Sequence, residues 1–501
     1  MARRDARGGE PVAHAAPVVD IAPGSVRGFW RGPSAAFLGI PFAQAPVGDL
    51  RFAAPVPPEP WAGVRDAREN GATAKRAKPG ERTLIPEPAI PGESTLNVNV
   101  FTPLPGAVDA ALPVLVWIHG GGFVEGSPAS PWYDGAAFTR DGIVTVSVSY
   151  RLGFDGFGAI EDAPSNRGVR DWLAALEWVQ TNIRAFGGDP GRVTIAGQSA
   201  GGGAVLTLLG MPAAQHLFHA VWALSAVVGD VPAARATALV DRLADLAGVA
   251  PTRAGFRSVP EARLLELQDG AASALGTSPF EKLRSTLDEG RAWAPTIDGD
   301  LLTRPTPESL RSRIGADKPL VLGTTDDEFT MATDRARKAL RFVPVSLALG
   351  RLQKDRGVRN AYLADNAQQR RRGTAAVLGR YATDRIFRAF AVRVADARGD
   401  APTWMYRFSW VSPTIGWACH CLDVPFWWDC LDADAVPGIA GDAPPQALAD
   451  ALHGSAAAFI RGAEPGWEAW SDSRGTTRVF GGEASTADVI PDGYASVRAL
   501  V

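Results

Sequence analysis

The chain has 501 residues, of which 46% are hydrophobic and 21% are charged, and its formal net charge is −3. This composition is typical of a soluble globular protein with a large core, and it excludes disordered and fibrous chains. Because no long run of lysine and arginine occurs, nucleic acid and anionic lipid are not expected as partners, and a small neutral molecule is.

Cellular location is predicted from the cysteines and the apolar runs. All three cysteines lie between residues 419 and 430, and this odd, clustered set is a poor disulfide framework. The longest apolar runs, such as residues 112–118, are far shorter than the roughly 20 residues of a membrane helix. We therefore expect a cytoplasmic protein without a membrane segment, whose first 15 residues form a disordered leader.

The order of elements predicts an α/β fold with a large, mostly parallel sheet. Two extended stretches, 24–30 and 35–42, predict a small antiparallel edge near the N-terminus. Apolar, β-branched runs then predict buried strands at 113–119, 142–150, 192–198, 220–227, 319–325 and 403–410. Segments 232–316 and 329–400 are mainly helical and are expected to form insertions that roof the sheet. We predict a single domain over residues 1–501.

One helix is predicted between the second and third of these buried strands. An apolar stripe runs from Val169 to Phe186 at steps of three and four residues, and Ser165 or Asn166 can cap its start. Strand, helix and strand in this order form a parallel crossover unit.

The segment 197–201, GQSAG, is the only match in the chain to the pattern G-x-S-x-G. It follows a predicted strand and precedes a predicted helix, which is the context of a nucleophile elbow. In such a turn the glycines remove side chains that would collide, and the Ser199 hydroxyl projects above the carboxyl edge of the sheet. A glycine-rich turn with an incidental serine is the plainer alternative, and the flanking strand and helix argue against it.

A serine nucleophile needs a base and a group that orients the base. Of the six histidines, His14, His119, His216 and His219 do not follow an acid in the order serine, acid, histidine. His453 lies on an amphipathic helix, where we expect a partly buried or surface position. His420 remains, because it lies in a loop just after the predicted strand 403–410.

Three adjacent carboxylates are candidates for the acid. Asp326, Asp327 and Glu328 all follow the strand 319–325, where a buried carboxylate could hold the imidazole. The residues alone do not choose among them.

The run His119 to Phe123, HGGGF, also follows a strand, and its backbone amides could approach the oxygen that gains charge in a tetrahedral intermediate.

Blocks along most of the chain resemble the type-B carboxylesterase family, which has the α/β-hydrolase fold and includes bacterial para-nitrobenzyl esterases and cholinesterases. The blocks include FLGIPFAQAPVGDLRF, PVLVWIHGGGF, GGDPGRVTIAGQSAGG, LGTTDDEF and ACHCLDVPF, in this order. The resemblance implies a catalytic triad of Ser199, Glu328 and His420. It also implies oxyanion-hole amides at Gly121, Gly122 and Ala200 and a second polar layer at Gln198, Ser225 and Asp423. Trp427 and Trp428 either line the acyl pocket or belong to the core.

The chain departs from the family pattern at several positions. Gln198 stands where most relatives have glutamate, and the loss of that negative charge argues against a cationic choline ester. Ser94 and Thr95 replace an acid and a cysteine, so the usual early disulfide is missing, in keeping with an intracellular protein. Trp172 replaces a residue that is commonly glutamine. Cys419 and Cys421 flank His420, but so tight a run is poorly suited to one tetrahedral metal ion.

The resulting expectation is a carboxylic ester hydrolase that forms an acyl-enzyme and needs neither a metal nor a cofactor. A neutral, moderately apolar ester is the expected substrate. An amidase or carbamate hydrolase with the same triad is one alternative, and a non-catalytic, cholinesterase-like binding scaffold is another. The sequence leaves the acyl group, the alcohol and the oligomeric state open.

Overall fold

The computed structural model describes residues 15–77, 84–273, 281, 284–285, 287–288, 290–482 and 487–501. Apart from residue 15, the predicted leader lies outside the described residues. Within them, no helix combines the length and the apolar character that crossing a membrane requires.

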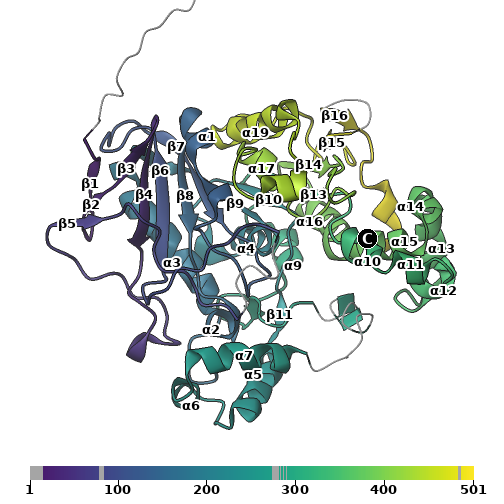
Figure 1. The fold of residues 1–501 in the computed structure, drawn as a ribbon, viewed down its shortest axis with the longest axis horizontal. Coiled ribbons are helices and arrows are strands. Elements are labelled where there is room, and N and C mark those ends of the chain that lie inside the picture. Colours follow the sequence, from purple (N-terminus) through teal and green to yellow (C-terminus); the bar gives the residue numbers. More distant parts are fainter. Residues whose placement is uncertain are drawn as a thin grey trace, which may run out of the picture.

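One large sheet organises the described part of the chain (Figure 1). Its 11 strands follow the order β16-β15-β14-β13-β10-β9-β7-β8-β6-β4-β3. Neighbours from β8 to β15 pair in parallel, whereas β3, β4, β6 and β16 pair antiparallel at the two ends. The six predicted buried strands are confirmed as β7 (Leu112–Ile118), β8 (Val144–Val148), β9 (Gly188–Gln198), β10 (Ala220–Leu224), β13 (Leu320–Thr325) and β14 (Thr403–Phe408).

The predicted N-terminal edge is present, but one of its two stretches is split. β3 (Phe29–Arg31) pairs with β4 (Ser34–Pro41), which pairs with β6 (Asn97–Thr102). β2 (Gly24–Arg27) belongs instead to a separate sheet with β1 (Val18–Ile21) and β5 (Val64–Asp66). The split falls at Gly28, where a Cβ would lie 2.4 Å from the carbonyl oxygen of Ala36.

Helices cover both faces of the sheet. Along β7, Val114, Val116 and Ile118 point to one core cluster, and Leu115 and Trp117 point to another, as the alternation of a strand requires. The first cluster packs against α3 (Arg167–Asn182) and α4 (Ala200–Leu209), and the second against α17 (Val424–Trp427) and α19 (Gln446–Ile460).

The predicted crossover helix is α3, which connects β8 to β9 across β7. Its apolar stripe is buried as expected, but the predicted side-chain cap is wrong. Asn166 precedes α3 in a left-handed conformation (φ 52°) and makes no capping bond. The side-chain amide of Asn166 and the Ser165 hydroxyl instead donate to Asp298, at 2.7 and 2.5 Å. These two bonds connect the start of the helix to the first insertion.

Both insertions are mainly helical, as predicted. The first contains α5 (Ala233–Ala247), α6 (Arg253–Arg257), α7 (Glu261–Ala272) and α9 (Thr306–Arg311), and also a short parallel pair, β11 (Val231–Pro232) and β12 (Thr296–Ile297). The second contains α10 (Thr330–Asp334), α11 (Arg337–Leu340), α12 (Val345–Gly350), α13 (Arg356–Asp365), α14 (Ala367–Arg372), α15 (Thr374–Thr383) and α16 (Ala389–Arg398). They follow β10 and β13, so both leave the sheet at its carboxyl edge.

The remaining elements are short. They include α1 (Ala136–Arg140), α2 (Gly153–Phe157), α18 (Val436–Ala440), the C-terminal strands β15 (Thr477–Phe480) and β16 (Ala487–Ile490), and the 3₁₀ helix η6 (Ala495–Leu500).

Candidate active site

Ser199 occupies a strained turn between β9 and α4. Its φ of 59° and ψ of −119° lie in a region that residues with a side chain rarely adopt. The flanking glycines are required by packing. A Cβ on Gly201 would lie 1.9 Å from the carbonyl oxygen of Ile118, and a Cβ on Gly197 would lie 2.5 Å from the backbone of Gly201. The turn therefore has the geometry predicted for a nucleophile elbow.

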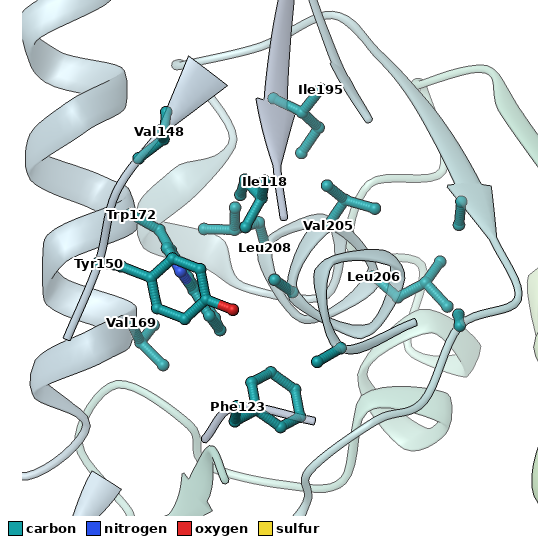
Figure 2. Close-up of a cluster of buried hydrophobic side chains, with 14 of the residues drawn as sticks. Ile118, Phe123, Val148, Tyr150, Val169, Trp172, Ile195, Val205, Leu206 and Leu208 are labelled. Carbon is teal, nitrogen blue, oxygen red and sulfur yellow. The ribbon is translucent and has the colours of Figure 1, made fainter. Parts of the chain in front are cut away.

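Neighbouring strands and the apolar side of α4 hold this turn in place. The amide of Ser199 donates to Leu224 at the end of β10 (2.9 Å), and the amide of Val227 donates to the carbonyl of Ser199 (3.0 Å). Val205 and Leu208 of α4 pack in the same cluster as Ile118 and Ile195 of the strands beneath (Figure 2). The backbone of Ser199 is thus held in place by the sheet and by α4.

His420 contacts Glu328 across 92 residues of sequence. Its Nδ1 lies 2.5 Å from Oε2 of Glu328, and its backbone amide donates to the carbonyl of Glu328 at 2.9 Å. The other carboxylate oxygen accepts the amide of Thr325 at 3.0 Å. Phe329 and Phe387 pack on the imidazole, each with ring centroids 5.0 Å away. Glu328 is fully buried, so both of its carboxylate oxygens face protein groups rather than solvent.

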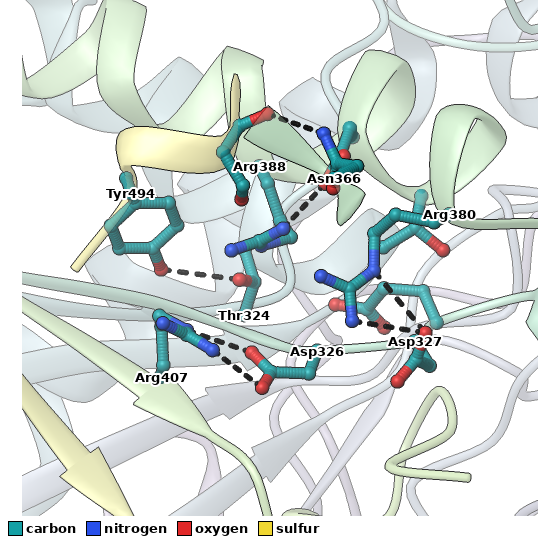
Figure 3. A network of polar contacts seen from close by, with 12 residues as sticks. Thr324, Asp326, Asp327, Asn366, Arg380, Arg388, Arg407 and Tyr494 are labelled. Atoms are coloured by element: carbon teal, nitrogen blue, oxygen red, sulfur yellow. Dashed lines mark hydrogen bonds and ion pairs between the residues drawn. The ribbon is translucent and has the colours of Figure 1, made fainter. Parts of the chain in front are cut away.

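The two carboxylates next to Glu328 are engaged elsewhere (Figure 3). Asp326 forms a bidentate ion pair with Arg407 at 2.8 and 2.6 Å. Although burial opposes its ionisation, Arg407 holds the pKa of Asp326 well below its usual range. Asp327 accepts two bonds from Arg380 at 3.2 and 3.1 Å. Of the three candidates that the residues left open, Glu328 is the one that reaches the imidazole.

Gln198 contacts the opposite side of the same ring. Its side-chain nitrogen lies 3.2 Å from Nε2 of His420. An amide NH₂ donates, so this contact and the Glu328 contact together favour the imidazole tautomer with the proton on Nδ1 and a lone pair on Nε2. That lone pair is the group a general base uses.

The glycine run after β7 reaches the same place. Gly121 and Gly122 have φ angles of 100° and 63°, and a Cβ on Gly121 would lie 2.2 Å from the carbonyl oxygen of Glu125. Within the described ranges, the amides of Gly121, Gly122 and Ala200 donate to no protein acceptor. A Cβ on Gly120 would come within 3.2 Å of the Ser199 Cβ, so the run passes directly beside the serine.

Buried aromatic residues support this run from below. His119 stacks on Tyr150 with ring centroids 4.4 Å apart, and its Nδ1 donates to the carbonyl of Gly120 at 2.9 Å. Burial lowers the pKa of His119 to about 3, so it is a neutral structural residue. Trp172 packs edge-on against Tyr150, and its ring centroid lies 6.2 Å from that of Phe123 (Figure 2). The unusual tryptophan therefore belongs to the core beneath the glycine run.

Ser225 and Asp423, the other two residues of the predicted second layer, form no hydrogen bond with Ser199, Glu328 or His420 in the described residues. Ser225 is fully buried just after β10, and its amide donates to Gly323. Asp423 accepts a bond from the Tyr406 hydroxyl at 3.1 Å. Burial, together with the charge of Glu328, raises the pKa of Asp423 to about 7.

The remaining predicted residues belong to the core. Burial raises the pKa of the Cys419 thiol to about 12 and that of Cys421 well above its usual value, so both stay protonated. Trp427 and Trp428 are fully buried against Trp117, with ring centroids 5.2 Å away in each case. In the part of the chain that the structure describes, no three His, Cys, Asp or Glu side chains are grouped to bind a metal ion.

The expectation of a partly buried or surface position for His453 is wrong. This residue is 3% exposed, and it contacts the carbonyl of Trp427 and the carboxylate of Asp141 at 2.9 and 2.8 Å. The helix that carries it packs on the sheet, so its polar ring is enclosed and hydrogen-bonded.

Ser199 and His420 line one cavity of about 480 Å³. Residues of both insertions contribute to its wall, which supports their predicted role as a roof. Sequence reasoning did not anticipate four charged residues of this wall, and no local motif marks them: Glu87, Glu125, Arg291 and Arg335. The other lining residues are mainly apolar or belong to the glycine run: Leu84, Ile85, Gly121, Gly122, Val124, Gln198, Phe329, Met331, Ala332 and Cys421.

A strand–serine–helix turn at the carboxyl edge of a large, mostly parallel sheet defines an α/β-hydrolase. Comparison with solved structures agrees. A carboxylesterase of Geobacillus stearothermophilus superimposes with a TM-score of 0.80 at 31% identity, covering 96% of this chain and 99% of that one. A thermophilic para-nitrobenzyl esterase superimposes with a TM-score of 0.81 at 28% identity, over 96% and 100% of the two chains.

Sequence comparisons identify the family within this fold class. The model of the carboxylesterase family matches residues 15–466. The para-nitrobenzyl esterase of Bacillus subtilis is 33% identical over 82% of each chain, and the phenmedipham hydrolase of Pseudarthrobacter oxydans is 33% identical over 86% of each. The chain belongs to the carboxylesterase family, and it is a carboxylic ester hydrolase.

Proposed function

We propose that the protein hydrolyses carboxylic esters through an acyl-enzyme formed on Ser199. The Ser199 oxygen attacks the ester carbonyl while Nε2 of His420 takes its proton, and the imidazolium then protonates the departing alcohol as the C–O bond breaks. Water repeats the sequence and releases the acid. Glu328 holds the imidazole and stabilises its charged form.

The developing oxyanion is stabilised by the amides of Gly121, Gly122 and Ala200 in this proposal. Each lacks a protein acceptor in the described chain, and preorganised donors of this kind are typically worth about 10² to 10³ in rate apiece. The amide of Gln198 has to yield its contact with Nε2 when the serine hydroxyl engages it. Because Gln198 is uncharged, breaking this contact leaves no carboxylate next to the imidazolium, whereas the glutamate of most relatives would.

The contact of 2.5 Å between His420 and Glu328, in the cavity that Ser199 also lines, is the observation that carries the proposal. In this proposal the acid, the base and the nucleophile come from three distant segments, and amides without a protein acceptor in the described residues lie beside them. Asp326 and Asp327 are paired with arginines, and the cysteines near His420 are buried. Among the described residues we therefore propose no other nucleophile and base for this cavity.

The test is a pre-steady-state assay with a para-nitrophenyl ester. We expect a burst of nitrophenol equal to the enzyme concentration, and covalent labelling of Ser199 by a fluorophosphonate probe. The variant Ser199→Ala should lose both while keeping its thermal unfolding temperature. Unchanged turnover in that variant would refute the mechanism, and absence of both hydrolysis and labelling in the parent protein would favour a binding scaffold.

Hydrolysis of amides or carbamates is a second candidate, because one of the similar proteins is named phenmedipham hydrolase rather than esterase. The same groups would act, with His420 protonating a nitrogen leaving group. Matched ester, carbamate and anilide derivatives of one acyl group separate the candidates by their ratios of kcat/KM.

A further inference from the structure

Arg291 is a charged residue of the active-site cavity that the proposed chemistry does not use. It lines the cavity together with Ser199 and His420. Its guanidinium lies against the glycine run, because a Cβ added to Gly122 would come within 3.4 Å of Nη1 and 3.5 Å of Cζ. A positive charge is therefore held beside the predicted oxyanion hole.

No carboxylate of the described residues neutralises this charge. Arg291 forms no ion pair there, and burial alone accounts for the lowered pKa of its guanidinium. The arginines behind Glu328 differ, since Arg380 and Arg407 each face a carboxylate at 3.1 and 2.6 Å. A partly exposed guanidinium that has no carboxylate partner among the described residues is available to bind a negative group from the cavity.

Arg291 also lines a neighbouring cavity of about 210 Å³, together with Arg385 and Arg393. The carboxylate in that wall, Asp230, is occupied by the amide and hydroxyl of Thr306, both at 2.9 Å. Three guanidinium groups and one engaged carboxylate leave this second cavity positively charged. An anion bound at Arg291 would therefore also be attracted by the charges of Arg385 and Arg393.

The acidic residues of the main cavity do not cancel Arg291. Glu87 lies 4.0 Å from the buried guanidinium of Arg76, and the charges of Glu87 and Glu125 both act on Arg76. Neither acid forms an ion pair with Arg291 in the described residues, and neither charge contributes to the pKa shift of Arg291. The other basic residue of the wall, Arg335, is exposed to solvent, where its charge is screened.

We propose that Arg291 is a specificity-determining residue that binds a carboxylate on the substrate, so that the preferred substrates are esters carrying a free carboxylate on the acyl or the alcohol side. This inference rests on the proposed ester hydrolysis, and it replaces the neutral ester expected from the sequence with an anionic one. An arginine offers a carboxylate two parallel hydrogen bonds, which would orient the scissile bond as well as hold the substrate.

The test compares two matched pairs of esters. On the acyl side, para-nitrophenyl hydrogen adipate is compared with para-nitrophenyl methyl adipate. On the alcohol side, para-acetoxybenzoate is compared with its methyl ester. In at least one pair, kcat/KM should favour the carboxylate by about 10-fold or more, which is the usual contribution of a hydrogen bond to a charged group.

The variant Arg291→Met should lose about 10- to 100-fold more in kcat/KM on the preferred anionic ester than on its neutral partner. Arg291→Lys should restore part of the preference, because it retains the charge but not the bidentate geometry. Arg341→Met removes an exposed arginine outside the cavity wall and serves as the matched control, with no change expected for either ester.

An equal loss on both members of a pair in Arg291→Met, or a preference of the parent protein for the neutral ester in both pairs, would overturn the inference. If the variant does not fold, inhibition of the parent protein by adipate and by adipamide decides the question, since only the dianion should compete. Hydrolysis of none of the four esters would refute the proposed function itself, a result distinct from equal hydrolysis within each pair.

Discussion

Replacing Glu328 by glutamine tests separately the carboxylate that we propose as catalytic and the two aspartates next to it. Its two oxygens accept from different donors, Nδ1 of His420 at 2.5 Å and the amide of Thr325 at 3.0 Å. A glutamine has one acceptor oxygen and one donor group, so it cannot satisfy both. If the oxygen faces Thr325, the NH₂ group donates to Nδ1 and moves the ring proton to Nε2, where the Gln198 oxygen can accept it.

A protonated Nε2 cannot take a proton from Ser199. The comparable loss of a triad carboxylate in serine proteases lowers kcat by about 10⁴, and we expect a similar loss in Glu328→Gln. Stability should change far less, by about 1–3 kcal/mol, because only one donor loses its acceptor. The assay is single-turnover acylation by a para-nitrophenyl ester, together with thermal unfolding of the same preparation.

Asp327→Asn is the matched control for this experiment. It breaks the buried pair with Arg380, and loss of one partner of such a pair typically costs about 3–5 kcal/mol. The folded fraction of this variant should nevertheless acylate at nearly the parent rate. Near-normal acylation in Glu328→Gln, combined with its loss in a folded Asp327→Asn, would show that the wrong carboxylate has been assigned.

Other consequences follow from single contacts. Gly201→Ala should abolish acylation or folding, because its Cβ would lie 1.9 Å from the carbonyl oxygen of Ile118. Gly454→Ala, at an exposed position of α19 where a Cβ would have no atom within 4 Å, should instead stabilise the protein by about 0.5–1 kcal/mol in thermal unfolding. Because the folded-state pKa of Asp423 is raised to about 7, its contribution to stability is lost as the pH rises from about 4 through 7, by up to about 4 kcal/mol. Asp423→Asn keeps an acceptor for Tyr406, so its gain in unfolding temperature over the parent protein should be larger at pH 8 than at pH 5. An equal gain at both values would contradict a neutral Asp423 below pH 7.

Much of the sheet was predictable because its central strands are buried on both faces. Continuous apolar runs such as those of β7 and β13 have few other uses in a globular chain. β6 escaped notice because asparagines alternate along it, and asparagine is rare in strands. The structure shows why they are tolerated. Asn97 donates to the carbonyls of Ala72 and Ser94, and Asn99 donates to Asn70 and Pro128, so the buried amides are satisfied by loops that the strand meets only in the folded protein.

The sequence by itself determined the elbow at Ser199, the glycine run and the order of the candidate groups, because these depend on local backbone geometry that only certain residues permit. Tertiary structure decided which of three adjacent carboxylates faces His420. Arg407 and Arg380 come from distant elements, and their pairing with Asp326 and Asp327 depends on contacts that no local pattern encodes. The position of Arg291 against Gly122 arises in the same way, since electrostatic partners are set by distance in space rather than by separation along the chain.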